Sequence, residues 1–198
     1  SAKALRSIQQ HDLPQWDPKR RVLGVIRPTA EVIGKLTRNG HVGLLATEGT
    51  VKSHSYDMEI AKLWPNIKVT GQACPFWVPL VEYNEADSPG ADYFVKKRID
   101  QLMQLDPDID TIILGCTHFP LLMPKILKYV QPGVRIVPQG EYVADSLKDY
   151  LVRHTDMASR LTTGATVKYY TTENPDKFKE SATIFLHEQV HVEHIELG

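Results

Sequence analysis

The sequence has few cysteines, no long apolar run and no long run of one charge. It carries two cysteines in 198 residues, Cys74 and Cys116, which excludes a disulfide-stapled scaffold and favours a reducing compartment. No apolar stretch approaches the roughly 18 residues that a membrane helix needs, and the first residues show no secretory leader. We therefore expect a soluble cytoplasmic protein that has no membrane partner.

Basic side chains are scattered along the chain. The formal net charge is −1, and the basic clusters at 19–21 and 96–98 are short and contain no interleaved aromatic residue. Such clusters are typical of solvated loops or helix faces, so we expect no nucleic-acid partner. What the sequence does have is apolar content, 42% of its residues, which is enough for a sizeable core.

Short apolar runs alternate with helical patterns along most of the chain. The runs predict strands at 22–26, 42–46, 67–70, 111–114, 134–137 and 167–171. Apolar periodicity and capping residues predict helices at 28–37, 53–63, 76–83, around 95–105, from Pro120, at 142–152 and at 176–186. This alternation predicts an α/β fold with parallel sheets.

The stretch with the most reactive side chains follows the buried run Thr111–Leu114. A glycine ends that run, and Cys116, Thr117 and His118 stand between it and a helix that begins near Pro120. Open α/β sheets bind ligands at this edge. A helix N-terminus favours negative charge, so we expect a lowered pKa at Cys116. A buried structural thiol is the commoner role for one cysteine, but the neighbouring hydroxyl and imidazole favour a reactive one.

A second loop follows the run 42–46 and opens the next helix. It extends from Thr47 to Ser53, and it matches neither a P-loop nor a G-x-G-x-x-G loop. The hydroxyls of Thr47 and Thr50 could cap the helix, or with free backbone N–H groups they could hold a carboxylate or phosphate. The place of this loop at the same predicted sheet edge as Cys116 favours the second role.

Two further residues are less distinctive. Cys74 is far from Cys116 in the sequence, belongs to no C-x-x-C motif and precedes Pro75, so we interpret it as a structural thiol. Glu82 lies on a mostly apolar predicted helix. There it is either solvated or able to reach the site as a proton relay or a partner for an ammonium group.

His187–His191 spells H-E-x-x-H, the zinc-protease motif. That chemistry needs both histidines on one helix and a third ligand, for which His194 is a nearby candidate. The residues from Val190 onward alternate as in a strand, so the spacing loses its helical meaning. We expect no metal site here.

Two phrases closely resemble the glutamate racemase family, within the aspartate/glutamate racemase superfamily. They are L-G-C-T-H-F-P-L-L at 114–122 and A-T-E-G-T-V-K-S at 46–53. Supporting phrases in the family's order are G-V-I-R-P at 24–28, A-C-P-F-W-V-P-L-V-E at 73–82 and Y-T-T-E-N-P-D-K-F at 170–178. The resemblance implies two pseudo-symmetric α/β domains with parallel sheets and an active site between them.

The resemblance also implies a racemase that uses no cofactor and no metal. Two cysteines face opposite sides of the substrate Cα, one removing the α-proton as a thiolate and the other delivering a proton. Cys116 matches the second of these cysteines, and His118 matches the group that tunes it or relays protons while also touching substrate. Cys74 does not match the first catalytic cysteine, which agrees with a structural role.

The other implied site residues accompany this cysteine. Thr117 matches a contact to the substrate carboxylate, and Glu82 matches an acidic residue that assists near the amino group. Thr47 and Thr50 match hydroxyls at the site. The implied reaction interconverts L- and D-glutamate and supplies D-glutamate for peptidoglycan, and we expect a homodimer.

The sequence also departs from the family pattern. The Cys-Asn-Thr phrase that carries the first catalytic cysteine and an Asp-Ser pair are both absent, and residues 1–5 resemble the helix that follows that phrase. We therefore expect 27–138 to be a complete second domain, and 1–26 with 139–198 to be the remnant of the first. Such a chain should not racemise alone by two bases. Phe119 stands where the family often has Tyr, outside the expected proton path.

Two alternatives stay open at this point. A related racemase could act on aspartate or a hydantoin, because side-chain specificity depends partly on the first domain. A chain with one catalytic cysteine could also be a ligand-binding or regulatory fragment without activity.

Overall fold

The computed structural model describes residues 2–197, except for the side chains of residues 2, 3 and 6. The chain forms two compact units, Ser1–Arg153 and His154–Gly198. None of its described helices is long and apolar enough to cross a membrane. The expected division into 27–138 and two flanking segments concerns the domains of the resembled family, so it stays a prediction for this chain.

The first unit is built on a four-stranded parallel sheet in the order β2-β1-β3-β4. Its strands are β1 His41–Ala46, β2 Lys68–Ala73, β3 Thr111–Leu114 and β4 Arg135–Pro138. Every residue of β3 is buried, as its nearly unbroken apolar run predicts. The α/β fold is confirmed, as are the strands expected near 42–46, 67–70, 111–114 and 134–137.

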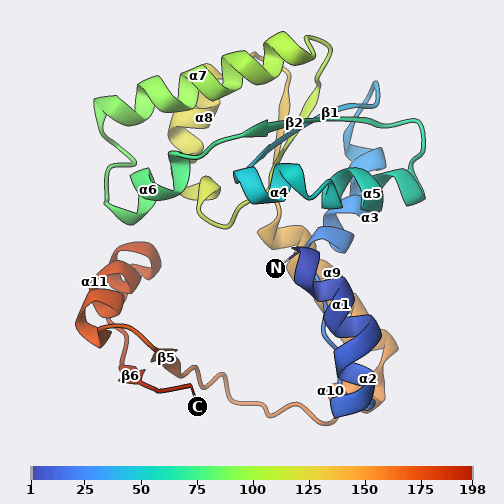
Figure 1. The fold of residues 1–198 in the computed structure, drawn as a ribbon, viewed down its shortest axis with the longest axis vertical. Coiled ribbons are helices and arrows are strands. Elements are labelled where there is room, and N and C mark those ends of the chain that lie inside the picture. The colour runs from blue at the N-terminus through green and yellow to red at the C-terminus, as the bar shows by residue number, and fades with distance from the viewer. Residues whose placement is uncertain (1, 198) are drawn as a thin grey trace. The chain divides into compact units, whose positions relative to one another are not determined.

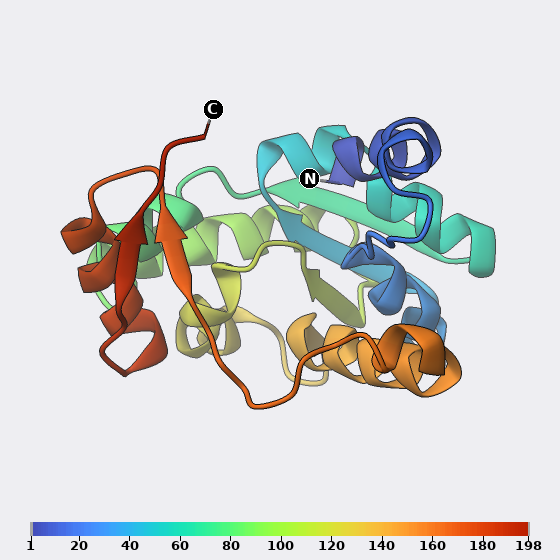
Figure 2. The ribbon, with the colours of Figure 1, turned by 90° about the horizontal axis from the view of Figure 1, so that it is seen from below.

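Helices cover both faces of this sheet. One side carries α3 Ile26–Leu36, α5 Ser55–Leu63 and α9 Gly140–Arg153, and the other carries α7 Pro89–Leu105 and α8 Met123–Tyr129 (Figure 1). α3 and α9 are in contact on their face (Figure 2). Val42, Leu44 and Ala46 alternate along β1 and pack with Ile33 of α3 and Ile60 of α5 in one buried cluster. Period-two alternation thus gives the sheet an apolar face under α3 and α5.

Short helical segments precede two of the predicted helices. The loop expected from Thr47 to Ser53 contains α4 Glu48–Lys52, and the helix expected at 53–63 is confirmed as α5. His54, with a left-handed backbone of φ 52°, separates the two. The helix expected from Pro120 begins as a 3₁₀ turn, Phe119–Leu122, and continues as α8. α6, Trp77–Glu82, confirms the helix expected at 76–83.

The strand expected at 22–26 does not form within the described residues, so this prediction was wrong. Leu23 and Val25 are 51% and 50% exposed, and α3 begins already at Ile26. The four-stranded sheet ends at β2 and β4, so no described strand pairs with this segment. An extended segment without a partner leaves its N–H and C=O groups to water, and apolar sequence alone does not make it a strand.

The start of the chain is helical. It forms α1 Ala2–Ser7, a π-helical turn at Ile8–Asp12 and α2 Leu13–Trp16. The expected opening helix is confirmed from Ala2 onward, and Ser1 lies outside the described residues. Leu13 and Pro14 form the first turn of α2. Pro14 thus stands near the start of α2, which directly follows the π-helical turn.

The second unit contains α10 Thr155–Ala158, β5 Tyr169–Thr171, α11 Pro175–Leu186 and β6 Val192–His194. β5 and β6 pair in parallel and lie side by side, with α11 between them in the chain (Figure 2). Asn174 caps α11 by accepting a hydrogen bond from Asp176 N at 2.8 Å. The helix expected at 176–186 is confirmed, whereas the strand expected at 167–171 begins only at Tyr169.

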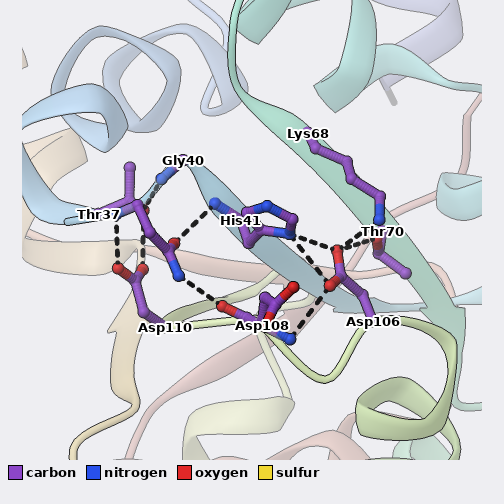
Figure 3. Close-up of polar contacts among 9 residues, drawn as sticks. Thr37, Gly40, His41, Lys68, Thr70, Asp106, Asp108 and Asp110 are labelled. Atoms are coloured by element: carbon purple, nitrogen blue, oxygen red, sulfur yellow. Dashed lines mark hydrogen bonds and ion pairs between the residues drawn. The ribbon is translucent and has the colours of Figure 1, made fainter.

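A buried polar cluster lies at the amino-terminal ends of the strands in the first unit (Figure 3). Asp106, the residue after α7, is 1% exposed. Its carboxylate forms hydrogen bonds with His41 Nδ1 at 3.0 Å and Thr70 Oγ1 at 3.3 Å, and an ion pair with Lys68 Nζ at 2.9 Å. These contacts join the starts of β1 and β2 to the end of α7.

Asp110, just before β3, is held in a similar way. Its carboxylate accepts hydrogen bonds from Thr37 Oγ1 at 2.7 Å and from the backbone N–H groups of Arg38 and Asn39 at 2.6 and 3.0 Å. Burial raises the pKa of Asp110, but these donors outweigh it, and the pKa lies below its ordinary value. Protein donors thus replace water around both carboxylates.

Asp106 makes this cluster testable through pH. Burial raises the pKa of its carboxyl group, but the hydrogen bonds from Lys68 and His41 outweigh burial and hold the pKa at about 2, below the ordinary 3.8. The folded state then binds this proton less readily than the unfolded state. The carboxylate therefore stabilises the fold above the unfolded pKa, and its contribution is lost as the pH falls from about 5 to about 2.

We predict that Asp106→Asn lowers the free energy of unfolding at neutral pH by about 2 kcal/mol, because Lys68 and His41 lose the charge that they contact. Between about pH 5 and pH 2 the variant should lose less stability than the wild type. Urea unfolding followed by circular dichroism measures both effects. Asp100→Asn removes an exposed ion pair with Lys96, and as the control it should change stability by less than about 0.5 kcal/mol. An unchanged pH slope in Asp106→Asn would contradict the prediction.

Candidate active site

The candidate site lies at the opposite edge of the same sheet, where the strands end. Thr47 follows β1, and Gly115 and Cys116 follow β3. Leu45 lies opposite Leu114 in the register, and Gly115 N donates a hydrogen bond to Leu45 O at 2.8 Å. The two predicted loops therefore leave the sheet next to each other, at the edge where open α/β sheets bind ligands.

Gly115 allows the Cys116 turn to leave β3 close to β1. A Cβ atom at this position would lie 2.8 Å from Leu44 Cδ1 and 3.0 Å from Ala46 Cβ. A side chain there would push the turn away from the strand end. The glycine that ends the apolar run is thus a steric requirement of the site.

Three residues singled out from the sequence form a continuous line of polar contacts. Cys116 Sγ lies 3.8 Å from His118 Nδ1, and His118 Nε2 pairs with Glu82 Oε1 at the end of α6. Thr117 Oγ1 lies 3.5 Å from the same Nδ1 atom. Because the carboxylate accepts a hydrogen bond from Nε2–H, the Nδ1 atom of a neutral ring is the acceptor that faces the thiol. A thiol, an imidazole and a carboxylate thus form one path for a proton.

The expected lowering of the Cys116 pKa is not found, so this prediction was wrong. Burial raises the pKa of this half-buried thiol, and the backbone N–H groups of His118 and Phe119 offset the effect only in part. The element that follows is a short 3₁₀ turn, which offers a thiolate less favourable dipole than the expected α-helix. Cys116 in this chain is therefore protonated at neutral pH.

Thr47 and Thr50 lie where the sequence predicted, at the start of α4. Thr47 is the N-cap residue and its Oγ1 accepts from Thr50 N at 3.4 Å, while the two hydroxyl oxygens are 3.0 Å apart. The capping role that the sequence left open is therefore present. Lys52 pairs with Glu48 at 2.7 Å, so its charge is engaged within the same helix. A role of these hydroxyls in binding substrate stays a prediction.

A group of side chains behind the Cys116 turn was not predicted from the sequence. Gln139 follows β4, and its carboxamide contacts the hydroxyls of Thr29 and Tyr56 and the carbonyl of Leu114. The pKa of Tyr56 is raised to about 12, mainly by burial; the hydrogen bond to Gln139 lowers it, and Cys116, once ionised at high pH, raises it. The signal that could have found Gln139 is its position directly after a predicted strand, the same rule that selected Cys116.

Cys74 is placed apart from this chemistry. It is fully buried, its Sγ lies 3.6 Å from Gln72 O, and burial raises its pKa well above the ordinary value. A thiol in these surroundings stays protonated and acts as a small apolar side chain. The burial agrees with the structural role inferred from the sequence.

The H-E-x-x-H motif does not lie on one helix. α11 ends at Leu186, and His187 is its C-cap residue with a left-handed backbone, φ 55°. His191 lies beyond the helix, exposed, and its Nε2 is 3.9 Å from Glu193 Oε1. The two histidines therefore lack the helical spacing that a zinc protease requires.

Among the described residues, one group of side chains has the composition of a metal site: His41, Asp106 and Asp108. It belongs to the polar cluster at the other edge of the sheet, and Lys68 already neutralises Asp106. A cavity of about 280 Å³, lined by residues 34, 37–40 and 63–67, also lies at that edge. Neither feature includes a residue of the Cys116 site.

This chain is similar to known proteins over most of its length. The family model described as Asp/Glu/Hydantoin racemase matches residues 20–145. A glutamate racemase of Lactiplantibacillus plantarum is 40% identical over 182 residues, which are 89% of this chain and 64% of that protein. A glutamate racemase of Streptococcus pyogenes is 39% identical over 179 residues, which are 89% of this chain and 66% of that protein. The chain thus spans slightly less than two thirds of the length of these curated relatives.

Solved structures give the same result for the fold. Glutamate racemase isoform RacE1 from Bacillus anthracis superposes with a TM-score of 0.82 at 30% identity, covering 96% of this chain and 70% of that one. The enzyme from Thermus thermophilus, solved with beta-chloro-D-alanine, has a TM-score of 0.74 at 28% identity, covering 95% of this chain and 67% of that one. With a family model that matches more than half of the sequence, the chain belongs to the Asp/Glu/Hydantoin racemase family.

Proposed function

We propose that this chain carries one half of the active site of a glutamate racemase, with Cys116 as one of its two proton-transfer bases. The observation that carries the proposal is the line from Cys116 Sγ through His118 to Glu82, at the carboxyl edge of the sheet. The names of the relatives support glutamate as the substrate. Two of the neighbouring structures hold D-glutamate or beta-chloro-D-alanine, which supports an amino-acid ligand.

The proposed reaction is a proton transfer at the substrate Cα. One base removes the α-proton, the electron pair of the broken C–H bond is delocalised into the carboxyl group, and an acid on the opposite face returns a proton. Nothing is oxidised or reduced, and the net change is the configuration at Cα. The α-proton is weakly acidic, so the base must be strong and correctly placed.

The residues around Cys116 have separate parts in this proposal. His118 takes the thiol proton at Nδ1 and returns it, and Glu82 stabilises the imidazolium that forms. The hydroxyls of Thr117, Thr47 and Thr50 hold the substrate carboxylate. Cys74 is fully buried and is not the opposing base. That base comes from the portion of the family fold that this chain does not span.

In the cell, the proposed product is D-glutamate for peptidoglycan, made by a cytoplasmic homodimer. The family description also includes aspartate and hydantoin as substrates, so a different amino acid is the second candidate. Initial rates of α-proton exchange with L-glutamate and L-aspartate separate the two. A chain that binds D-glutamate but exchanges no proton would be a ligand-binding fragment.

We expect this chain to catalyse α-proton exchange rather than racemisation, because it offers one base. In D₂O the chain should replace the α-proton of one glutamate enantiomer with deuterium, without changing its configuration. Proton NMR of the α-position and circular dichroism of the amino acid measure the two properties. Cys116→Ser should slow exchange by about 100-fold or more, since a hydroxyl is a far weaker acid than a thiol.

Cys74→Ala is the matched control for this experiment, because it removes the other thiol. It should leave exchange by the folded variant close to the wild-type rate. Exchange that persists in Cys116→Ser, or that depends on Cys74 instead, would contradict the assignment of the base. A wild-type chain that exchanges neither enantiomer would contradict catalysis by this chain.

Replacing His118 separates a proton relay from substrate binding at this residue. His118→Asn should lower kcat for exchange by about 10- to 100-fold with a smaller change in KM, because the thiol loses its proton acceptor. His54→Asn, at an exposed histidine of the same unit, is the control and should change neither constant. A higher KM at an unchanged kcat would assign His118 to substrate binding alone.

A further inference from the structure

Gln139 connects four elements of the first unit through one carboxamide. It follows β4 and precedes α9. Its Oε1 accepts hydrogen bonds from Thr29 Oγ1 of α3 at 3.1 Å and from Tyr56 Oη of α5 at 2.7 Å. Its Nε2 donates to Leu114 O at the end of β3, at 3.0 Å. The acceptor and donor ends of the amide are therefore both engaged.

The partners of this carboxamide are out of contact with water. Thr29 is 0% exposed, Tyr56 2% and Leu114 1%. A buried hydroxyl or carbonyl that loses its protein partner cannot recover the hydrogen bond from solvent, so each contact is costly to break. Burial thus makes the Gln139 contacts a fixed part of the fold at this edge.

The Leu114 carbonyl lies two residues before Cys116, which connects the carboxamide to the thiol. Between them, Gly115 N donates to Leu45 O at 2.8 Å. On the far side of the turn, Phe119 N donates to Cys116 O at 3.2 Å. The backbone that carries Sγ is thus held to Gln139 and β1 on one side and closed by its own turn on the other.

We propose that Gln139 is a positioning residue for the Cys116 turn. It holds the Leu114 carbonyl in place, and thereby keeps Sγ half-buried and 3.8 Å from His118 Nδ1. The catalytic meaning of this role rests on the proposed function of Cys116. The structural role of Gln139 does not depend on that function, because the exposure and acidity of the thiol can be measured without substrate.

The test is the rate at which iodoacetamide alkylates Cys116 as a function of pH, measured on the full chain by peptide mass spectrometry. Gln139→Met keeps a side chain of similar length without its hydrogen bonds. Iodoacetamide should alkylate Cys116 about tenfold faster in this variant than in the wild type. Without the hydrogen bond to Leu114, the Cys116 turn opens more often and exposes the thiol. The midpoint of the pH profile should fall toward that of an ordinary cysteine, since burial is what raises the pKa of this thiol.

Cys74 is an internal reporter of global opening. It is fully buried, so it reacts only when the unit unfolds. In Gln139→Met it should stay protected while Cys116 becomes reactive. Parallel acceleration of both thiols would mean that the variant only destabilises the fold, and it would overturn the proposal.

A matched control tests whether any lost hydrogen bond at a strand end has the same effect. Thr37 lies at the opposite edge of the sheet, and Thr37→Val removes two hydrogen bonds of its hydroxyl. The hydroxyl donates to Asp110 Oδ1 at 2.7 Å and accepts from Gly40 N at 2.9 Å. This variant should leave the Cys116 profile unchanged. Equal effects of Thr37→Val and Gln139→Met would overturn the positioning role.

A second variant covers the case in which Gln139→Met does not fold. Gln139→Glu preserves the volume and the acceptor for Thr29 and Tyr56, but it cannot donate to Leu114. The added charge of the glutamate shifts the thiol pKa, so the two proteins are compared at high pH, where the thiol is fully ionised. There the rate of Cys116 alkylation should be higher in Gln139→Glu than in the wild type. An equal rate would overturn the proposal.

The rate of α-proton exchange should change in the opposite direction to the rate of alkylation. In Gln139→Met the Cys116 thiol is more exposed and is alkylated faster. It is no longer aligned with His118, so exchange of the α-proton of glutamate should be slower. Faster alkylation with undiminished exchange would overturn the link to catalysis. If the wild type does not exchange, the proposed function fails, and the alkylation profiles still decide the role of Gln139.

Discussion

The parallel pairing of β1 with β3 is the contact on which the rest of the first unit depends. It sets Leu45 opposite Leu114, so the segments that follow the two strands leave the sheet at one edge and those that precede them meet at the other. The thiol of Cys116 and the hydroxyls after β1 lie at the first edge. The buried carboxylates that precede β3 lie at the second. Because a shift of one residue would turn the apolar faces of the strands around, the packing of both faces fixes this register.

The same physical competition has opposite outcomes at the two edges. Burial disfavours a charged group, and donors aimed at it favour the charge. Around Asp106 and Asp110 the donors outweigh burial, so both carboxyl groups ionise more readily than usual. Around Cys116 and Tyr56 burial prevails, so both groups hold their protons. One edge therefore contributes stability through fixed charges, and the other keeps neutral groups that can still exchange protons.

Sequence patterns predicted the parts of this unit that depend on local physics. The run Thr111–Leu114 is buried as expected, and Cys116, His118 and Glu82 meet although Glu82 comes from a distant helix. In that case the family resemblance assigned Glu82 to the site but not its contact with His118, because spacing alone gave no distance between α6 and β3. The segment 22–26 has strand-like composition but no described partner, and pairing is a tertiary property. The pKa of Cys116 and the contacts of Gln139 were missed for the same reason, since burial and long-range hydrogen bonds have no signature in a single sequence.

The raised pKa of Cys116 bears on how the proposed base would work. A thiol that is protonated at rest is an acid, and it becomes a base only when its proton moves to His118 Nδ1. Glu82 on the far nitrogen favours that move, because a carboxylate stabilises the imidazolium. A bound amino acid would bring an ammonium group beside the thiol, and a positive charge lowers the cost of a thiolate. In the proposed reaction the substrate thus helps to create its own base, and a resting thiol avoids the oxidation and alkylation to which a permanent thiolate is prone.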